Sequence, residues 1–290
     1  GGGKKKKKKK KKKYKKEKKK KKKKILIIKK KGVVRMLKEY KKHVEERAEQ
    51  NIPPLPLDAD QTSELIELLK EDHEESDFLI NLLKERVPAG VDQAAYVKAA
   101  FLADITSGKA SSPYITKIDA VKILGTMLGG YNIQPLIQCL KDNELAETAA
   151  HVLSRTLLIF DAFNEIFELS KTNEHAKKVV EEWANATWFT EKTDIKEQIK
   201  LTVYKVTGEI NTDDLSPAPD AWSRPDIPLH ALAMFKMPRT GLDDPLGTIE
   251  KLKEKGNPLV FVGDVVGTGS SRKSATNSVL WHMGDEIPFI

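Results

Sequence analysis

Apolar residues recur at helical spacing over most of the chain, and this periodicity limits the fold more than any other feature. The pattern begins at Met36 and continues to about Lys192, with Gly, Pro and Asn interrupting it at short intervals. Short helices joined by brief turns bury their apolar faces by packing in antiparallel pairs. We therefore predict an all-α domain over residues 36–192, arranged as an α-solenoid of stacked helix pairs.

Capping residues and apolar faces locate the individual helices. The first follows the cap candidates Asp60 and Thr62, and the second begins near Ser76 and stops at Val87. Further helices are predicted at 92–107, 116–128, 132–141, 144–158, 160–170 and 172–186. We expect five aromatic residues near the end of this region to pack in its core; they are Phe160, Phe163, Phe167, Trp183 and Trp188.

A second domain begins where the pattern changes, near Thr193. Leu201, Val203 and Val206, with Thr202, Tyr204 and Lys205 between them, give the alternation of a half-buried strand. A second apolar strand is predicted at Leu259–Val266, and a Gly/Ser loop then leads into a helix over Ser274–His282. Strand, loop and helix together predict an α/β domain over 193–290. We expect it to be incomplete, because neither a closing strand nor a capped final helix precedes residue 290.

Charge is divided unevenly along the chain. The formal net charge is +9, yet residues 1–31 hold 22 Lys and one Glu, which leaves 29 basic and 41 acidic residues elsewhere and a charge of −12. A body with this balance has no general attraction for nucleic acid or anionic membranes.

The lysine-rich segment has three interpretations. It is an arm that binds polyanions, a solvated run that buries too little apolar surface to fold, or a translation of non-coding bases. The third is favoured because uninterrupted G and A encode Gly and Lys, and the run passes directly from Gly3 into Lys4. We therefore treat residues 1–35 as a low-complexity tail that is disordered or artefactual.

Cysteine usage and hydropathy restrict the class of protein further. Cys139 is the one cysteine, so neither a disulfide nor a CxxC metal site forms within the chain, and we expect Cys139 to be a small buried residue. The apolar run Ile25–Ile28 is far shorter than the ~20 residues of a membrane span. We expect a cytoplasmic protein with no membrane partner and no metal ligands of its own.

The stretch from Gly263 to Arg272 carries the clearest chemical signal. Its glycines let backbone N–H groups approach a ligand, and the next helix presents the positive end of its dipole. Ser270, Ser271 and Arg272 add two hydroxyls and a guanidinium that suits a carboxylate or phosphate. Taken alone, the pattern is equally that of an ordinary tight turn between strand and helix.

Other kinds of site fit this stretch poorly. The spacing of a Walker A loop is absent, and Arg272 stands where a dinucleotide fingerprint has its third glycine. A serine hydrolase needs a histidine beside Ser270 or Ser271, and nothing in the sequence places His230 or His282 there. The polar pair Asp213 and Asp214 lies in a turn, where aspartates more often hydrogen-bond the backbone than bind metal.

Several long segments resemble the aconitase B family. Thr207–Pro228, with the run Asn-Thr-Asp-Asp-Leu-Ser-Pro, and Gly263–Ser278 are similar to the swivel domain of that family. Arg86–Asp92 and Leu124–Ile133 resemble the HEAT-like domain that precedes the swivel. The resemblance covers essentially all of residues 36–290. It implies a multidomain chain, with an all-α HEAT-like solenoid at 36–192 followed by a truncated α/β swivel domain at 193–290.

The resemblance also implies an activity. Family members interconvert citrate and isocitrate through cis-aconitate in the tricarboxylic acid cycle, and some accept 2-methylisocitrate. The serine that acts as base in the family matches Ser270, and substrate-binding positions match Arg224, Ser270, Ser271 and Arg272. These residue types suit a reaction in which a base removes a proton beside a carboxylate while arginines hold carboxylates.

Cofactor and partners follow from the same resemblance. The family holds a 4Fe–4S cluster on three cysteines of its C-terminal domains, and Cys139 matches none of them. We therefore expect this chain to bind no cluster and to be inactive by itself. In the family, the HEAT-like domain is associated with dimerisation and mRNA binding, so the alternative function is a protein–protein or mRNA interaction module.

Overall fold

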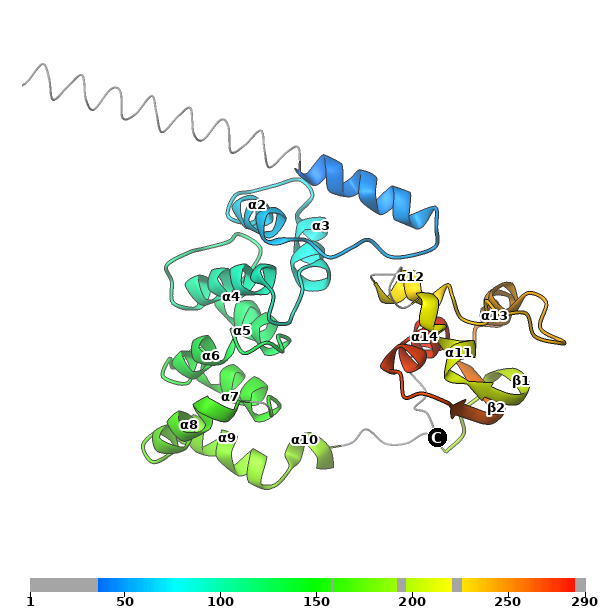
Figure 1. Cartoon of the computed structure of the whole chain (residues 1–290). Coiled ribbons are helices and arrows are strands. Elements are labelled where there is room, and N and C mark those ends of the chain that lie inside the picture. Colours follow the sequence, from blue (N-terminus) through cyan, green and yellow to red (C-terminus); the bar gives the residue numbers. More distant parts are fainter. Residues whose placement is uncertain (1–35, 158, 192–196, 221–225, 285–290) are drawn as a thin grey trace, which may run out of the picture. The chain divides into compact units, whose positions relative to one another are not determined.

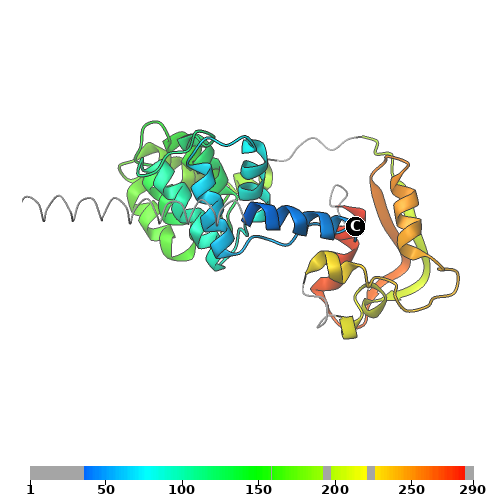
Figure 2. The ribbon, with the colours of Figure 1, turned by 90° about the horizontal axis from the view of Figure 1, so that it is seen from above.

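A computed structural model of the chain describes residues 36–157, 159–191, 197–220 and 226–284 (Figures 1 and 2). These residues divide into two compact units. The first comprises residues 36–48 and 54–191, and the second comprises 49–53, 197–220 and 226–284. Within the described ranges, no helix is long and apolar enough to cross a membrane.

The described residues of the first unit form a stack of short helices. A helix over residues 36–48 is followed by α2 (Ala59–Leu69), α3 (Ser76–Asn81), η1 (Leu82–Arg86, a turn of π-helix), α4 (Gln93–Thr106), α5 (Lys117–Gly125), α6 (Ile133–Cys139), α7 (Ala146–Ser154), η2 (Phe160–Ala162), α8 (Phe163–Ser170), α9 (Glu174–Ala184) and α10 (Thr187–Thr190). Helix α2 packs on α4, α4 on α5, α5 on α7, and α7 on α9 (Figure 1). The prediction of helices over this region is confirmed.

One apolar core runs through the stack. Leu65 of α2, Leu102 of α4, Leu124 of α5 and Leu153 of α7 are fully buried members of it. Burial of a leucine side chain contributes roughly 1.5–3 kcal/mol. The helices are therefore held mainly by their neighbours in the stack.

The predicted cap residues of α2 are wrong. Asp58 is the N-cap, because its carboxylate accepts the backbone N–H of Gln61 at 2.8 Å while the Gln61 side chain accepts the N–H of Asp58 at 3.0 Å. Thr62 lies inside the helix, where it is buried and its hydroxyl donates to the Asp58 carbonyl at 2.6 Å. The helix thus begins one residue before Asp60.

Two helices end earlier than their apolar periodicity predicts. Helix α5 stops at Gly125 instead of residue 128, because the buried Asn132 amide donates to the carbonyls of Leu124 at 2.9 Å and Met127 at 3.1 Å. Helix α7 stops at Ser154 instead of 158. Near this end the hydroxyl of Thr156 donates to the Val152 carbonyl at 2.9 Å, and the indole N–H of Trp183 donates to the Leu153 carbonyl at 3.1 Å. Side chains thus occupy carbonyls near both helix ends.

The expectation that all five aromatic residues pack in the core is wrong. Trp183 does pack against it, but Phe160 is 79% exposed and Trp188 46% exposed. Phe163 and Phe167 are each 43% exposed and stack on one another with ring centroids 6.1 Å apart. Within α8 only Ile166 is fully buried, and Phe163 stacks on Trp183 of α9 with ring centroids 5.9 Å apart, so it lies at the edge of the core.

The second unit contains a two-stranded parallel sheet with helices around it. Its elements are β1 (Thr202–Asn211), α11 (Thr212–Leu215), η3 (Ala218–Asp220), α12 (Ile227–Ala231), α13 (Pro245–Lys253), β2 (Leu259–Thr268) and α14 (Lys273–Met283). Helix α13 packs on β1, and α14 packs on β2 and α12 (Figure 2, orange and red). The predicted order of strand, Gly/Ser loop and helix is confirmed, as is the α/β character of the described residues.

The strand predicted near residue 201 is present as β1, and its inner face starts at Thr202. Tyr204 and Val206 are buried together with Thr202, whereas Leu201 and Val203 are 37% and 49% exposed. The Tyr204 ring packs near Phe235 and Phe261, with centroids 6.5 and 5.9 Å away. Because side chains alternate along a strand, turning Tyr204 inward turns its neighbour Val203 outward.

Candidate active site

The residues from Ser270 to Arg272 lie between the end of β2 and the start of α14. Gly267 and Gly269 have φ of +85° and +90°, a backbone region that side chains rarely adopt, so the reversal of the chain depends on them. A Cβ on Gly269 would lie 3.2 Å from the Thr212 hydroxyl, so the loop passes close to α11. Loops at the carboxyl ends of parallel strands, followed by a helix N-terminus, commonly bind anions.

A pocket of about 680 Å³ opens beside this loop, and Ser271 and Arg272 line it. Apolar side chains of β2 and α14 make up much of the remaining wall; they include Leu259, Phe261, Val279 and Met283. Ser270 is exposed on the same loop, outside the lining of the pocket. The structure therefore brings Ser271 and Arg272 together at the pocket, and Arg224 lies outside the described residues.

The Arg272 guanidinium is held on one side. Its Nη1 forms an ion pair with Asp213 and donates to the Ser216 carbonyl at 3.0 Å. The hydrogen bond from Arg272 lowers the pKa of the Asp213 carboxyl, and the backbone N–H of Ala218 lowers it further. Within the described part of the chain, Nη2 and Nε of Arg272 make no hydrogen bond, which leaves them available to a carboxylate.

The two aspartates of the polar turn behave partly as predicted. Asp214 completes a capping box at α11 with Asn211, and Asp213 accepts the N–H of Ala218 at 3.3 Å, so both bond the backbone. The ion pair between Asp213 and Arg272 was not predicted. The two residues are 59 positions apart, and no local pattern signals such a contact.

Neither histidine of this unit is paired with Ser270 or Ser271. His230 Nε2 lies 2.7 Å from the Ser216 hydroxyl, and His282 Nε2 lies 2.9 Å from the Ala231 carbonyl. Burial lowers the pKa of His282, which favours its neutral form. The described residues thus give no support to a serine hydrolase.

Among the described residues, no three His, Cys, Asp or Glu side chains are grouped to hold a metal ion. Cys139, the one cysteine of the sequence, is buried on α6, and burial raises the pKa of its thiol. An iron–sulfur cluster needs several thiolates, so the residues of this chain do not fit one.

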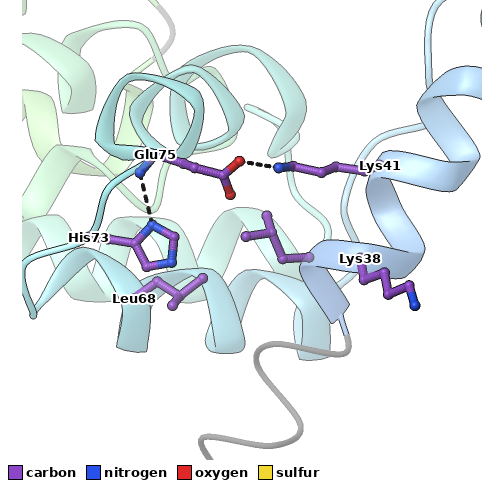
Figure 3. Close-up of a pocket in the computed structure, with 6 residues that line it drawn as sticks. Lys38, Lys41, Leu68, His73 and Glu75 are labelled. Atoms are coloured by element: carbon purple, nitrogen blue, oxygen red, sulfur yellow. Dashed lines mark hydrogen bonds and ion pairs between the residues drawn. The ribbon is translucent and has the colours of Figure 1, made fainter.

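A second, smaller hollow of about 330 Å³ lies in the helical unit (Figure 3). Lys41 forms an ion pair with Glu75 across it, and the backbone N–H of Glu75 donates to His73 Nδ1 at 3.1 Å. These polar groups are occupied with one another. The loop at Arg272, with guanidinium N–H groups still available, is the better candidate site.

Comparison with known proteins gives matches over both units. The family model for the aconitate B N-terminal domain matches residues 39–189, and that for the aconitate hydratase 2 N-terminus matches 201–290. Aconitate hydratase B of Escherichia coli is 59% identical over 264 residues, and that of Pseudomonas aeruginosa is 58% identical over 264. The protein of the same name from Helicobacter pylori is 50% identical over 256.

The matches cover 88% of this chain and 30% of each of these three relatives, so the chain spans less than a third of their length. The first family model alone accounts for more than half of the 290 residues. The chain therefore belongs to the aconitase B family.

Proposed function

We propose that the native polypeptide containing this chain is an aconitate hydratase that interconverts citrate and isocitrate through cis-aconitate. The observation that carries the proposal is the placement of Arg272 and Ser271 at a pocket beside the start of α14. Citrate has three carboxylates, and a guanidinium with N–H groups available beside a helix N-terminus suits one of them. The names of the relatives support the same activity.

In this proposal, four residues of the chain act on the substrate. Arg224 and Arg272 hold carboxylates, and Ser271 donates a hydrogen bond to one. Ser270, as its alkoxide, takes the proton from the carbon beside a carboxylate; the electron pair of that C–H bond forms the double bond of cis-aconitate, and the hydroxyl on the neighbouring carbon leaves as water with a proton from another acid. A serine hydroxyl is a weak base at neutral pH, so groups outside the described residues must activate Ser270.

We do not assign the iron–sulfur cluster of the family to this chain. The family uses a 4Fe–4S cluster, and one cysteine cannot supply its ligands. We infer that the ligands come from other parts of the native polypeptide, so that residues 36–290 alone are inactive. We also infer a cytoplasmic location, where the lone thiol of Cys139 stays reduced.

An assay of the purified native polypeptide tests this function. We expect formation of cis-aconitate from citrate and from isocitrate, with 2-methylisocitrate as a further substrate to compare. Ser270→Ala should lower kcat by roughly a hundredfold or more, the usual contribution of a general base. Ser107→Ala, at an exposed serine after α4, is the control and should keep full activity. No turnover by the unsubstituted protein, or full activity of Ser270→Ala, would refute the proposal.

A second function is supported by the outer surface of the helical unit. Exposed large apolar side chains lie in two places, on η2 with α8 and on α10; they are Phe160, Phe163, Phe167, Trp188 and Phe189. Apolar patches of this kind mark interaction sites. We propose that the stacked helices form a HEAT-like solenoid that binds a protein partner, with a second copy of the chain as the first candidate.

The same surface fits mRNA less well. Outside the lysine-rich tail the chain carries −12, which opposes binding to a polyanion. Sedimentation of the native polypeptide and of its Phe160→Ser, Phe163→Ser variant tests the dimer, since only the variant should sediment as a monomer. RNA titration with protein lacking residues 1–35 tests the other partner, and we expect no binding.

A further inference from the structure

A buried chain of hydrogen bonds joins three elements of the second unit behind the candidate site. The Ser216 hydroxyl lies 2.7 Å from His230 Nε2 and 2.6 Å from the Ser274 hydroxyl. Ser216 follows α11, His230 lies on α12, and Ser274 lies in the first turn of α14. Ser216 is 0% exposed and His230 6% exposed.

This chain of hydrogen bonds reaches the guanidinium through the backbone. The carbonyl of Ser216, the residue at its centre, accepts the Nη1 hydrogen bond of Arg272 at 3.0 Å. Ser274 lies two positions after Arg272, so the same hydroxyl network also fixes the start of the helix that follows the loop. Arg272 is thus tied to the network in two ways. Its guanidinium bonds to the Ser216 carbonyl, and its backbone leads directly into the helical turn that holds Ser274.

The hydrogen atoms can be assigned consistently along the chain. With His230 Nε2 as acceptor, Ser216 donates to it and Ser274 donates to Ser216; with Nε2 protonated, both directions reverse. In either arrangement each of the two short contacts has one donor and one acceptor. Burying hydroxyl and imidazole groups without partners is costly, whereas a fully satisfied network fixes a single geometry.

We propose that Ser216, His230 and Ser274 are positioning residues that set the Arg272 guanidinium toward the pocket. This inference rests on the proposed function for the meaning of the pocket, but not for the orientation of Arg272. The Ser216 carbonyl and Asp213 hold Nη1, and the network holds the Ser216 carbonyl. The Arg272 side chain is then already ordered before substrate binds, with Nη2 and Nε directed to the substrate.

The test compares KM for citrate in the native polypeptide and in Ser216→Ala, His230→Gln and Ser274→Ala. We expect KM to rise by about tenfold, and by up to about a hundredfold if Arg272 moves by an ångström. Ser274→Thr keeps the hydroxyl at a partly exposed position and should restore KM. The control is His282→Gln, which removes another buried imidazole from the contact between α12 and α14.

A second measurement does not depend on citrate. Phenylglyoxal modifies accessible guanidinium groups, and mass spectrometry of the peptide containing Arg272 gives its rate of modification. We expect this rate to rise several-fold in Ser216→Ala, His230→Gln and Ser274→Ala, and to stay at the unsubstituted value in Ser274→Thr and His282→Gln. If the unsubstituted protein does not act on citrate but the modification rates differ as expected, the proposed function fails and the positioning role stands.

The inference is overturned if KM and the modification rate of Arg272 change no more in the three network variants than in His282→Gln. It is also overturned if Ser274→Thr behaves like Ser274→Ala, because the hydroxyl would then be irrelevant. Ser274 is the safest position for this comparison, since its partial exposure lets either variant fold.

Discussion

Arg239 and Asp214 form an ion pair in which Nη1 lies 3.1 Å from Oδ2, and both side chains are largely buried. The same guanidinium donates Nη2 to the carbonyls of Thr207 at 2.9 Å and Glu209 at 2.6 Å. These carbonyls belong to the part of β1 where pairing with β2 shifts, between Val206 and Glu209. Arg239 therefore supplies hydrogen bonds to carbonyls at the irregular part of the ladder.

Removing this guanidinium should loosen the sheet. We expect Arg239→Ala to destabilise the second unit by about 2–4 kcal/mol, because a carboxylate and two carbonyls lose their partner. Arg239→Lys should recover little, since one ammonium cannot reach all three acceptors in the same geometry. Hydrogen–deuterium exchange of peptides from β1 measures the effect. Lys251→Ala, at an exposed position of α13, is the control, and equal protection in Arg239→Ala and Lys251→Ala would contradict the account.

Asn132 should be essential to the end of α5. It is 0% exposed and its amide donates to the carbonyls of Leu124 and Met127. We expect Asn132→Ala to cost about 1–3 kcal/mol, and Asn132→Asp to cost more, because a carboxylate would face two carbonyl oxygens. Urea unfolding followed in the helical unit gives both values. Asn143→Ala removes an exposed amide and serves as the control; a smaller loss for Asp than for Ala would contradict this assignment.

Lys98 should make the helical unit more stable at alkaline pH. It is 1% exposed on α4, and burial lowers its pKa from 10.5 to about 8. Between about pH 8 and pH 10.5 the folded protein has lost the Lys98 proton that the unfolded chain still binds, so the free energy of unfolding rises with pH across this window. Below about pH 8 the penalty is fully present, at up to about 3 kcal/mol.

Replacing the amine tests this directly. Lys98→Met should raise stability at neutral pH and remove most of the increase above pH 8, whereas Lys109→Met, at an exposed lysine, should change neither. Urea unfolding at a series of pH values provides the measurement. A variant that retains the full alkaline increase would show that another group causes it.

Gly129 should tolerate no side chain. A Cβ there would lie 1.9 Å from the Gly90 carbonyl oxygen and 2.9 Å from the Val91 nitrogen, both of them backbone atoms. We expect Gly129→Ala to cost at least about 2–3 kcal/mol, because backbone must move to admit the methyl group. Gly90→Ala is the matched control on the other side of the contact, since its own Cβ would meet nothing within 4 Å. Thermal unfolding compares them, and similar melting temperatures would rule out the close approach.

Local patterns predicted the parts of the fold that depend on local physics. Helical spacing located the helices, and the order of apolar strand, glycines and helix located the loop at Ser270–Arg272. Some errors were local, such as the cap at Asp58, which bonds Gln61 three residues on, but others came from contacts between distant segments. Tyr204 faces inward on β1, where its ring packs near Phe235 and Phe261, so Val203 faces outward. The indole N–H of Trp183 bonds to the Leu153 carbonyl at the end of α7.

Some residues of the candidate site could be predicted from local sequence and others could not. Ser271 and Arg272 could be predicted because a Gly/Ser loop before a helix is a local signature of anion binding. Asp213 and Ser216 could not, since they reach Arg272 across 59 and 56 residues. The contact between Ser216 and His230 depends on the packing of α12 against α14, which spacing alone does not reveal.

The most direct test of the whole account is the effect of Arg272→Gln on kcat/KM for citrate in the native polypeptide. Glutamine keeps a polar side chain, but it is shorter and lacks the charge and the forked N–H groups. The account predicts that the unsubstituted protein converts citrate to isocitrate and that the variant loses roughly a hundred- to a thousandfold in kcat/KM. An unsubstituted protein without this activity, or a variant with the same kcat/KM, would contradict it.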